Sequence, residues 1–418
     1  MNRDKVLVYA DWDGLKQQRL GTIYAEKTKG REVYSFEYDA DWLKNMRDNV
    51  ALDPDLFLYA GRQYVPLNKA IFGVFADSCP DRWGRMLLQR RELYEARKEE
   101  RRPRSLTELD YLLGVYDAAR MGALRFKTVE QGYFLAADDD LATPPWTTLR
   151  TLENMSMAFE AGENGFSERW LLQLLAPGSS LGGARPKATV QAPDGSLWVA
   201  KFPSKHDEHD TGAWEMVVHD LACECGLNVP EAKIEVFSKH GSTFLSKRFD
   251  RKDNERIHFS SAMTLLGKTD GADFSDGTSY LDIASFIRSN GVSPAKDLAE
   301  LWRRVVFSIA VGNTDDHLRN HGFLLARNGW RLSPMFDVNP DVYGDNLSLN
   351  ITENDASMRF EVAAQAAVYF GINSNIAARG ISEIKSIVEN RWEKLARQYG
   401  LGRSAIEFMR PAFDMRLK

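Results

Sequence analysis

Cysteine is scarce in this sequence, and internal repeats, low-complexity tracts and long apolar runs are absent from it. The 418 residues include three cysteines, Cys79, Cys223 and Cys225. A sparse, odd set supplies no disulfide framework and is typical of a reducing compartment. Because Cys223 and Cys225 lie in an apolar helical pattern without a matching His or Cys pair, we expect core thiols rather than metal ligands.

A net positive charge is also missing. The 54 Lys and Arg residues are outnumbered by 59 Asp and Glu residues, which gives a formal net charge of -5 and argues against a surface that coats nucleic acid. A basic run at residues 97–104 contains two glutamates, which favours a solvated helix end and leaves a minor DNA contact open. No apolar run approaches membrane-spanning length and the first residues lack a signal-peptide core, so we expect a cytoplasmic protein with no membrane contact.

The rest of the composition is that of an ordinary globular protein, with 44% hydrophobic and 27% charged residues. The length predicts two or three domains. The segment 127–150 has the weakest core-forming character, with three aspartates at 138–140 followed by Thr143-Pro144-Pro145. We therefore expect a first part at 1–150, a strand-rich part with a glycine-rich loop at 151–265, and a helical part at 266–418.

Apolar periodicity predicts an α+β fold. Residues 5–60 follow the pattern of strands, and a loop at 77–85 leads into a helix. A hairpin is expected at 188–201 around Asp194-Gly195, then a helix at 213–225 and strands at 233–237 and 243–249. Beyond residue 280 the apolar stripes at 298–309 and 381–395 predict helices.

The densest group of polar residues lies at 313–321, between an apolar helix-like run and an apolar strand-like run. It holds two acids, two histidines and two asparagines in nine positions. Asp315 and Asn320 stand five apart, like the Asp and Asn of the protein-kinase catalytic loop, and Asp337 follows one short hairpin later. Phosphoryl transfer needs an acid that orients the attacking hydroxyl, and oxygen ligands for Mg²⁺. We predict Asp315 as the catalytic residue and Asn320 and Asp337 as the Mg²⁺ ligands.

Other kinase-like elements come earlier in the chain. Glycines at 178, 182 and 183 would let backbone N–H groups approach phosphates, although taken alone they favour an ordinary Gly/Ser turn, since their spacing is not G-x-G-x-x-G. Lys187 and Lys201 follow this loop, and Lys201 ends an apolar strand, where a phosphate contact would explain its charge. Glu215 is either the partner of Lys201 or a solvent-exposed acid. His317 is predicted to contact phosphate or nucleotide, and Asn313 to brace the loop.

A metallohydrolase is the alternative that the same loop suggests. Its ligands would be Asp315, Asp316, His317 and His321. The sequence lacks the further His or Asp clusters that a two-metal centre needs, so we rank this hypothesis well below the kinase.

The sequence resembles the HipA family of toxin kinases over nearly its whole length. The resemblance rests on four motifs in the right order, with a fifth at 75–84 that resembles the accessory N-terminal domain of the family. The four motifs are Gly182-Gly183-Ala184-Arg185-Pro186-Lys187, Phe244-Leu245-Ser246-Lys247-Arg248-Phe249-Asp250-Arg251, Gly312-Asn313-Thr314-Asp315-Asp316-His317-Leu318-Arg319-Asn320 and Phe336-Asp337-Val338-Asn339-Pro340.

The resemblance implies a bilobal, kinase-like fold and a serine/threonine kinase that is the toxin of a type II toxin–antitoxin module. Such kinases phosphorylate a translation component, glutamyl-tRNA synthetase in the best-studied members, and arrest growth in a dormant, drug-tolerant state. The implied partner is a HipB-like helix-turn-helix antitoxin that binds operator DNA. The implied cofactors are ATP and Mg²⁺.

The resemblance also implies roles for individual residues. The ATP lysine corresponds to Lys201, the catalytic acid to Asp315, and the autophosphorylated serine to Ser180, with Ser179 as the less favoured neighbour. Lys247 stands where one well-known branch of the family has an acid. The full predicted ATP site comprises Gly182, Gly183, Ala184, Arg185, Lys187, Lys201, Glu215, Lys247, Phe249, His317 and Asn320.

Two other functions remain open at this point. A small-molecule kinase would share the phosphoryl-transfer residues and differ only in its acceptor pocket. A non-catalytic co-repressor in a DNA-bound antitoxin complex would not need Lys201, Asp315, Asn320 and Asp337. The sequence does not identify the protein substrate, the oligomeric state or the extent of direct DNA contact.

Overall fold

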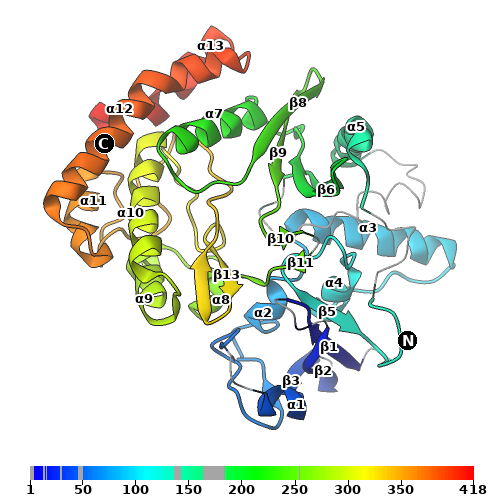
Figure 1. The fold of residues 1–418 in the computed structure, drawn as a ribbon. Helices are drawn as coiled ribbons and strands as arrows, with labels where there is room; N and C mark the ends of the chain where they lie inside the picture. Colours follow the sequence, from blue (N-terminus) through cyan, green and yellow to red (C-terminus); the bar gives the residue numbers. More distant parts are fainter. Residues whose placement is uncertain are drawn as a thin grey trace. The chain divides into compact units, whose positions relative to one another are not determined.

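The chain forms two compact units (Figure 1). Unit 1 comprises residues 1–205 and 248–260, and unit 2 comprises residues 206–247 and 261–418. This computed structural model describes residues 4–12, 15, 17–28, 31–45, 50–135, 143–162, 183, 185–253 and 255–418. The predicted α+β class is confirmed, with antiparallel strands early in the chain and mainly helices late in it. The predicted three-part division stays a prediction.

Unit 1 is built on a five-stranded antiparallel sheet in the order β4-β3-β2-β1-β5 (blue to cyan in Figure 1). The predicted strands are confirmed in β1–β3, but the prediction of strands up to residue 60 is wrong. A short helix follows β3 because the Asp39 side chain caps it by accepting from the Asp41 N–H at 2.9 Å. The elements are β1 Lys5–Ala10, β2 Gln18–Thr28, β3 Arg31–Tyr38, α1 Ala40–Lys44, β4 Gln63–Tyr64 and β5 Leu124–Lys127.

The polar motif at 77–84 begins the main helix of unit 1. The Asp81 side chain accepts from the Gly84 N–H at 2.9 Å and so caps α3 (Arg82–Lys98), as expected of an acid at this position. Trp83 is buried. The remaining elements of unit 1 are α2 Gly73–Ala76, α4 Glu108–Gly114, α5 Leu149–Glu160, the predicted hairpin β6 Lys187–Gln191 and β7 Leu197–Lys201, and the short pair β10 Arg251–Lys252 and β11 Glu255–Arg256.

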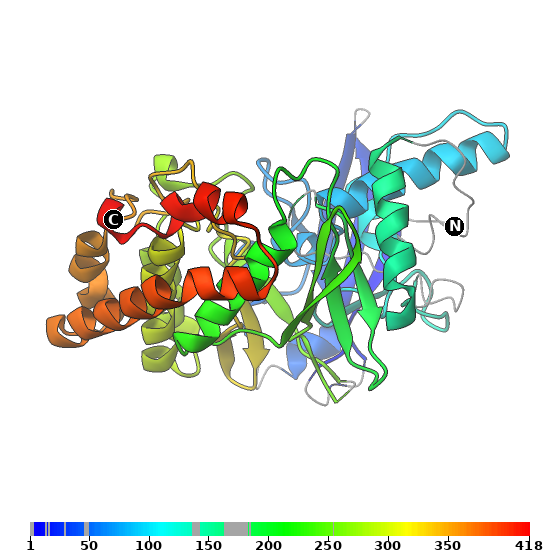
Figure 2. The ribbon, with the colours of Figure 1, turned by 90° about the horizontal axis from the view of Figure 1, so that it is seen from above.

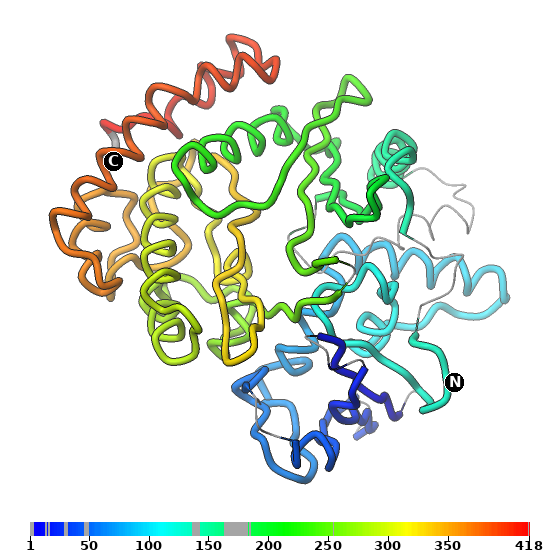
Figure 3. Tube along the Cα trace, in the orientation of Figure 1, coloured from blue at the N-terminus to red at the C-terminus, as the bar shows by residue number. Residues whose placement is uncertain are grey.

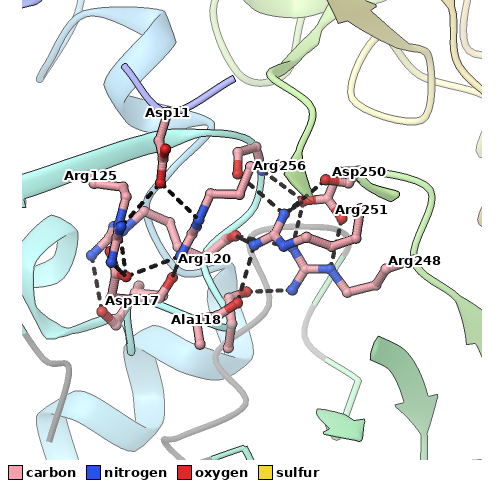
Figure 4. Close-up of polar contacts among 12 residues, drawn as sticks. Asp11, Asp117, Ala118, Arg120, Arg125, Arg248, Asp250, Arg251 and Arg256 are labelled. Carbon is pink, nitrogen blue, oxygen red and sulfur yellow. Dashed lines mark hydrogen bonds and ion pairs between the residues drawn. The ribbon is translucent and has the colours of Figure 1, made fainter. Parts of the chain in front are cut away.

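Residues 248–251 hold the loop 118–122 of the same unit (Figure 4). The Arg248 guanidinium donates to the carbonyls of Ala119 and Arg120, the latter at 3.0 Å. Arg251 donates to the carbonyls of Ala118, Arg120 and Gly122 at 3.1, 2.8 and 3.2 Å. The carboxylate of Asp250 accepts from the Gly122 N–H at 2.8 Å. The side chains of Arg248, Asp250 and Arg251 therefore satisfy five backbone groups of the loop 118–122. We call these three residues, together with the loop that they hold, the 118–122 clamp.

Charge pairing supports the clamp. Asp250 is fully buried, and its Oδ2 lies 2.6 Å from the nearest nitrogens of Arg248 and Arg251. Burial alone would raise the pKa of Asp250, but the two guanidinium groups outweigh it and hold the pKa well below its usual range. A second buried acid, Asp117, pairs with Arg125 at 2.6 Å and Arg256 at 3.0 Å beside the clamp.

Unit 1 should lose stability in mildly acidic solution because of His258. This ring is fully buried and stacks on Trp12 at 5.0 Å, and burial lowers its pKa from 6.5 to about 3. The folded state therefore holds the neutral ring, so the stabilisation is complete above the unfolded pKa and is lost as pH falls from 6.5 towards 3. We expect a loss of about 2 kcal/mol between pH 7.5 and pH 5. Urea unfolding at both pH values measures it, and an equal loss in His258→Phe would contradict it.

Unit 2 is organised around the apolar helix α10 (Pro294–Val311). It packs against α9 (Tyr280–Asn290), α11 (Phe360–Ala366) and α12 (Ser374–Gln398), as Figure 1 and the tube in Figure 3 show. Trp302 is buried and donates from Nε1 to the Ala363 carbonyl at 2.8 Å. Gly380 lets α12 approach, since a Cβ there would lie 3.1 Å from the Trp302 ring. The predicted helical stripes are confirmed.

The other elements of unit 2 include two hairpins and shorter helices. The predicted helix α7 lies alongside α12, as seen from above in Figure 2. These elements are α7 Thr211–Glu224, β8 Ala232–Ser238, β9 Gly241–Lys247, α8 Ala262–Leu265, β13 Gly322–Ala326, β14 Gly329–Leu332 and α13 Arg403–Met409. β12 (Phe259–Ser261) lies where the chain passes from unit 1 to unit 2.

The thiols follow the expectation in part. Cys225 is buried as predicted, but Cys223 is exposed, because it lies on the outer face of the last turn of α7; Cys79 is also buried. Among the described residues, no group of three or more His, Cys, Asp or Glu side chains is arranged to hold a metal ion. None of the described helices is both long enough and apolar enough to traverse a lipid bilayer.

Candidate active site

The polar loop at 313–321 begins where α10 ends. Gly312 ends the helix with φ +70°, a left-handed conformation that glycine adopts without strain. A Cβ at this position would lie 2.9 Å from the Ala412 carbonyl oxygen and 3.0 Å from that of Asp341. The chain therefore reverses directly from a buried helix into the loop, which fixes where the loop starts.

Asn313 braces the loop, as predicted. Its side chain is buried, donates from Nδ2 to Ser308 Oγ at 3.3 Å, and accepts on Oδ1 from the Asn339 N–H at 3.4 Å. Ser308 belongs to α10, and Asn339 follows Asp337 by two residues. One amide thus joins the helix, the loop and the segment that carries the predicted metal ligand Asp337.

The buried side chain of Asp316 holds the loop in place. Its carboxylate is 4% exposed and accepts from the Tyr280 hydroxyl at 2.6 Å and from Ser308 Oγ at 3.1 Å, and His321 Nε2 lies 3.0 Å away. Burial would raise the pKa of Asp316, but the facing His321 and these hydrogen bonds lower it below its usual range. Asp316 therefore remains ionised and buried, and the adjacent Asp315 has a rigid support.

Asp315 points out of the same loop into solvent. Its side chain is 84% exposed, and His317 Nε2 lies 3.9 Å from its Oδ1. Partial desolvation by the surrounding protein raises the pKa of the Asp315 carboxyl; His317 lowers it, and the carboxylates of Asp337, Asp316 and Asp341 raise it further. An accessible carboxylate on a rigid support with a raised pKa is suited to accept a proton from a bound hydroxyl.

The pair Asn320 and Asp337 fits an oxygen-ligated divalent cation. Asn320 donates from Nδ2 to the Asp315 carbonyl at 2.9 Å, which fixes the amide, and its buried Oδ1 has no hydrogen-bond partner. A buried amide oxygen without a donor costs free energy that a metal ion would offset. Asp337 has φ +58°, a left-handed conformation that few non-glycine residues adopt and that is over-represented at active sites.

The metallohydrolase hypothesis has no support in this geometry. Asp316 and His321 face each other in the interior, whereas Asp315 and His317 lie on the exposed side of the loop. The four side chains therefore do not converge on one point, in agreement with the lack of a His/Cys/Asp/Glu metal cluster in the described part of the chain.

Lys187 and Lys201 lie directly opposite each other in the hairpin of β6 and β7 in unit 1. Lys187 is 3% exposed, and its Nζ lies 2.8 Å from Asp81 Oδ2, so the residue that caps α3 also pairs with this lysine. Lys201 is half-buried at the end of its strand. The predicted roles of both lysines in ATP binding stay predictions.

The remaining predicted site residues are spread over both units. Glu215 is buried in α7, which excludes the alternative of a solvent-exposed acid. Lys247 ends β9 with its Nζ 3.3 Å from Glu231, and Phe249 contacts Phe259 with ring centroids 6.0 Å apart. Gly183 and Arg185 are described in unit 1, whereas Ser179, Ser180, Gly182 and Ala184 lie outside the described residues.

Sequence reasoning missed the support beneath Asp315. Tyr280 is 36 residues from Asp316 in the sequence. Ser308 is a polar residue within α10, a helix that was predicted from its apolar residues alone. A capping box of Ser279 and Asp282 starts α9 beside Tyr280, but no local pattern indicates that a tyrosine contacts a distant acid. Only the crowding of acids and histidines pointed to this place.

Comparison with known proteins identifies the family. The model of the HipA-like C-terminal domain matches residues 179–392, and that of the HipA N-terminal domain matches residues 14–127. The chain belongs to the HipA family. The first of these matches spans the loop at 313–321 and Asp337, and it begins beside the glycine-rich motif. The predicted resemblance is confirmed.

Two relatives each match part of the chain. A Sinorhizobium fredii protein named "Putative kinase Y4mE" is 28% identical over 192 residues, which are 40% of this chain and 44% of that protein. A Haemophilus influenzae protein named "Putative kinase" is 32% identical over 125 residues, which are 27% of this chain and 36% of that protein. The match thus spans less than half the length of either relative.

A solved structure shares the fold across the whole chain. It is HipA from Shewanella oneidensis MR-1, determined in a complex with HipB and operator DNA. The TM-score is 0.67 at 17% identity, and the alignment covers 99% of this chain and 96% of that one. At this level of identity the comparison establishes a HipA-type fold, in agreement with the predicted class.

Proposed function

We propose that this HipA-family chain is an ATP- and Mg²⁺-dependent serine/threonine protein kinase, and that it acts as the toxin of a type II toxin–antitoxin module. The observation that carries the proposal is the geometry of residues 315–320. An exposed carboxylate and a fixed amide with an unpartnered oxygen stand five residues apart on a loop with a buried anchor. The names of curated relatives as kinases support the same chemistry.

In the proposed reaction, the hydroxyl of the acceptor serine or threonine attacks the γ-phosphorus of ATP. A P–O bond forms to the hydroxyl oxygen, the bond to the β-phosphate oxygen breaks, ADP leaves, and the hydroxyl proton passes to Asp315. Asn320 and Asp337 would hold Mg²⁺, which neutralises phosphate charge. His317 would contact the γ-phosphate, Lys201, Gly183 and Arg185 would contact the nucleotide, and Lys247 and Phe249 would lie beside the base.

The proposed partner is a HipB-like helix-turn-helix antitoxin, through which the kinase would be brought to operator DNA. The structural neighbour from Shewanella oneidensis was solved with such partners, and this supports the proposal for a chain of the same fold. The proposed target is a translation component such as glutamyl-tRNA synthetase. A small-molecule acceptor would use the same loop, so the experiment must separate the two.

Growth and phosphorylation measured together test the function. Cells that express the wild-type chain should stop growing and accumulate a phosphorylated protein, whereas Asp315→Ala should do neither. Mass spectrometry of the purified chain after incubation with ATP and Mg²⁺ should find phosphate on Ser180, where a phosphate of about -1.5 to -2 charge would compete with ATP for the same amides and lysines. Equal growth arrest by both proteins, or an equal phosphate load on both, would rule out kinase chemistry as the toxic activity.

A further inference from the structure

Unit 2 exposes two aromatic rings in contact with each other. The Tyr343 side chain is 77% exposed and that of Phe408, on α13, is 41% exposed. Their ring centroids lie 6.3 Å apart with an interplanar angle of 69°, and the centroid of the His209 ring lies 6.1 Å from that of Phe408. We call Tyr343, Phe408 and His209 the aromatic platform. Exposed aromatic surface gains free energy when a partner covers it, and aromatic residues dominate the binding energy of many interfaces.

Hydrogen bonds attach the platform to the candidate catalytic loop. The Asp341 N–H donates to the Gly312 carbonyl at 2.9 Å, and the Asp341 carboxylate accepts from Thr314 Oγ1 at 2.6 Å and from the Tyr343 N–H at 2.9 Å. The backbone at Gly344 also touches the loop, because a Cβ there would lie 2.5 Å from Thr314 Cγ2. Thr314 directly precedes Asp315, so one acid sets the position of Tyr343 relative to the proposed proton acceptor.

We propose that the aromatic platform binds the acceptor segment of the protein substrate, through an aromatic or branched aliphatic side chain near the phosphorylated serine or threonine. This rests on the proposed kinase function. The occupant follows from continuity with the catalytic loop, since Thr314 directly precedes Asp315 and Asp341 joins Thr314 to Tyr343. The edge-to-face geometry of Tyr343 and Phe408 is suited to such a side chain.

The test uses the full chain and serine peptides in which each flanking position is varied in turn. With ATP and Mg²⁺, the wild type should prefer Phe, Tyr, Leu or Ile at one position. Tyr343→Ser should reduce that preference about three- to tenfold, through KM rather than kcat, because only ground-state binding is lost. Phe408→Ser should act in the same direction. Tyr369→Ser is the matched control, since Tyr369 is 44% exposed on a different part of unit 2 and should change nothing.

Further readouts separate the outcomes. Fluorescence anisotropy of labelled peptides without ATP measures docking even when no phosphate moves, and light scattering measures self-association. Equal peptide binding by wild type and Tyr343→Ser, or transfer without an apolar preference, would overturn the platform and leave the kinase intact. Binding that Tyr343→Ser weakens, with no transfer to any peptide or to the chain itself, would support the platform and overturn the kinase. Self-association that Tyr343→Ser abolishes would assign the rings to a second copy of the chain and overturn the proposal.

Discussion

Asp315→Asn is expected to lower phosphoryl transfer by about 10²- to 10⁴-fold, the range over which a positioned general base contributes. The asparagine keeps the shape of the side chain but cannot accept the hydroxyl proton. Folding stability should stay within about 0.5 kcal/mol, because the side chain is 84% exposed and His317 Nε2 lies 3.9 Å from its carboxylate. Radiolabelled phosphate transfer and urea unfolding measure the two quantities on the same protein.

The matched control is Glu389→Gln, which neutralises an exposed acid on α12 in the same unit. It should change neither rate nor stability. A transfer rate of Asp315→Asn within threefold of the wild-type rate would show that Asp315 is not the proton acceptor. A parallel loss of stability would instead show that the loop needs this charge in order to fold.

Asp250→Asn should produce the largest loss of stability, about 3–5 kcal/mol, which is the usual cost of removing one partner from a buried ion pair. The substitution leaves the guanidinium groups of Arg248 and Arg251 without their carboxylate in the interior of unit 1. It also weakens the hydrogen bond from the Gly122 N–H. Urea unfolding should show the loss, and amide hydrogen exchange at Gly122 should accelerate.

Asp253→Asn provides the control for this prediction. It removes a negative charge three residues away, from an exposed position whose φ of +47° asparagine tolerates well. Its effect should remain within about 0.5 kcal/mol. If both variants unfold at the same urea concentration, the 118–122 clamp contributes little to the stability of unit 1.

Local patterns were enough to predict the elements beside the site, because each depends on residues close in sequence. The Asp194-Gly195 turn between β6 and β7, the apolar stripe of α10 and the spacing of Asp315 and Asn320 are all of this kind. The predicted strands up to residue 60 failed at α1, where the aspartate cap at its start outweighed the alternation.

Long-range contacts could not be predicted in the same way. Tyr280 meets Asp316 across 36 residues, and Arg251 meets Gly122 across 129, with no periodicity that links them. The packing of whole elements determines such partners, and a single sequence taken without aligned homologues does not reveal them. The motif at 244–251 was recognised, but its part in holding the loop 118–122 came only from the structure.

The clamp also bears on how the chain is made. Ribosomes add about 5–20 residues per second, so the 129 residues between Gly122 and Arg251 take roughly 6–26 s to synthesise. Throughout that interval the carbonyls of the loop 118–122 have no guanidinium to accept from. The segment 248–251 that supplies the guanidinium groups is synthesised only after α7, β8 and β9. A chaperone or a pause in translation would act on this intermediate. A chain that ends before residue 248 would lack the side chains of Arg248, Asp250 and Arg251 that bind the loop 118–122.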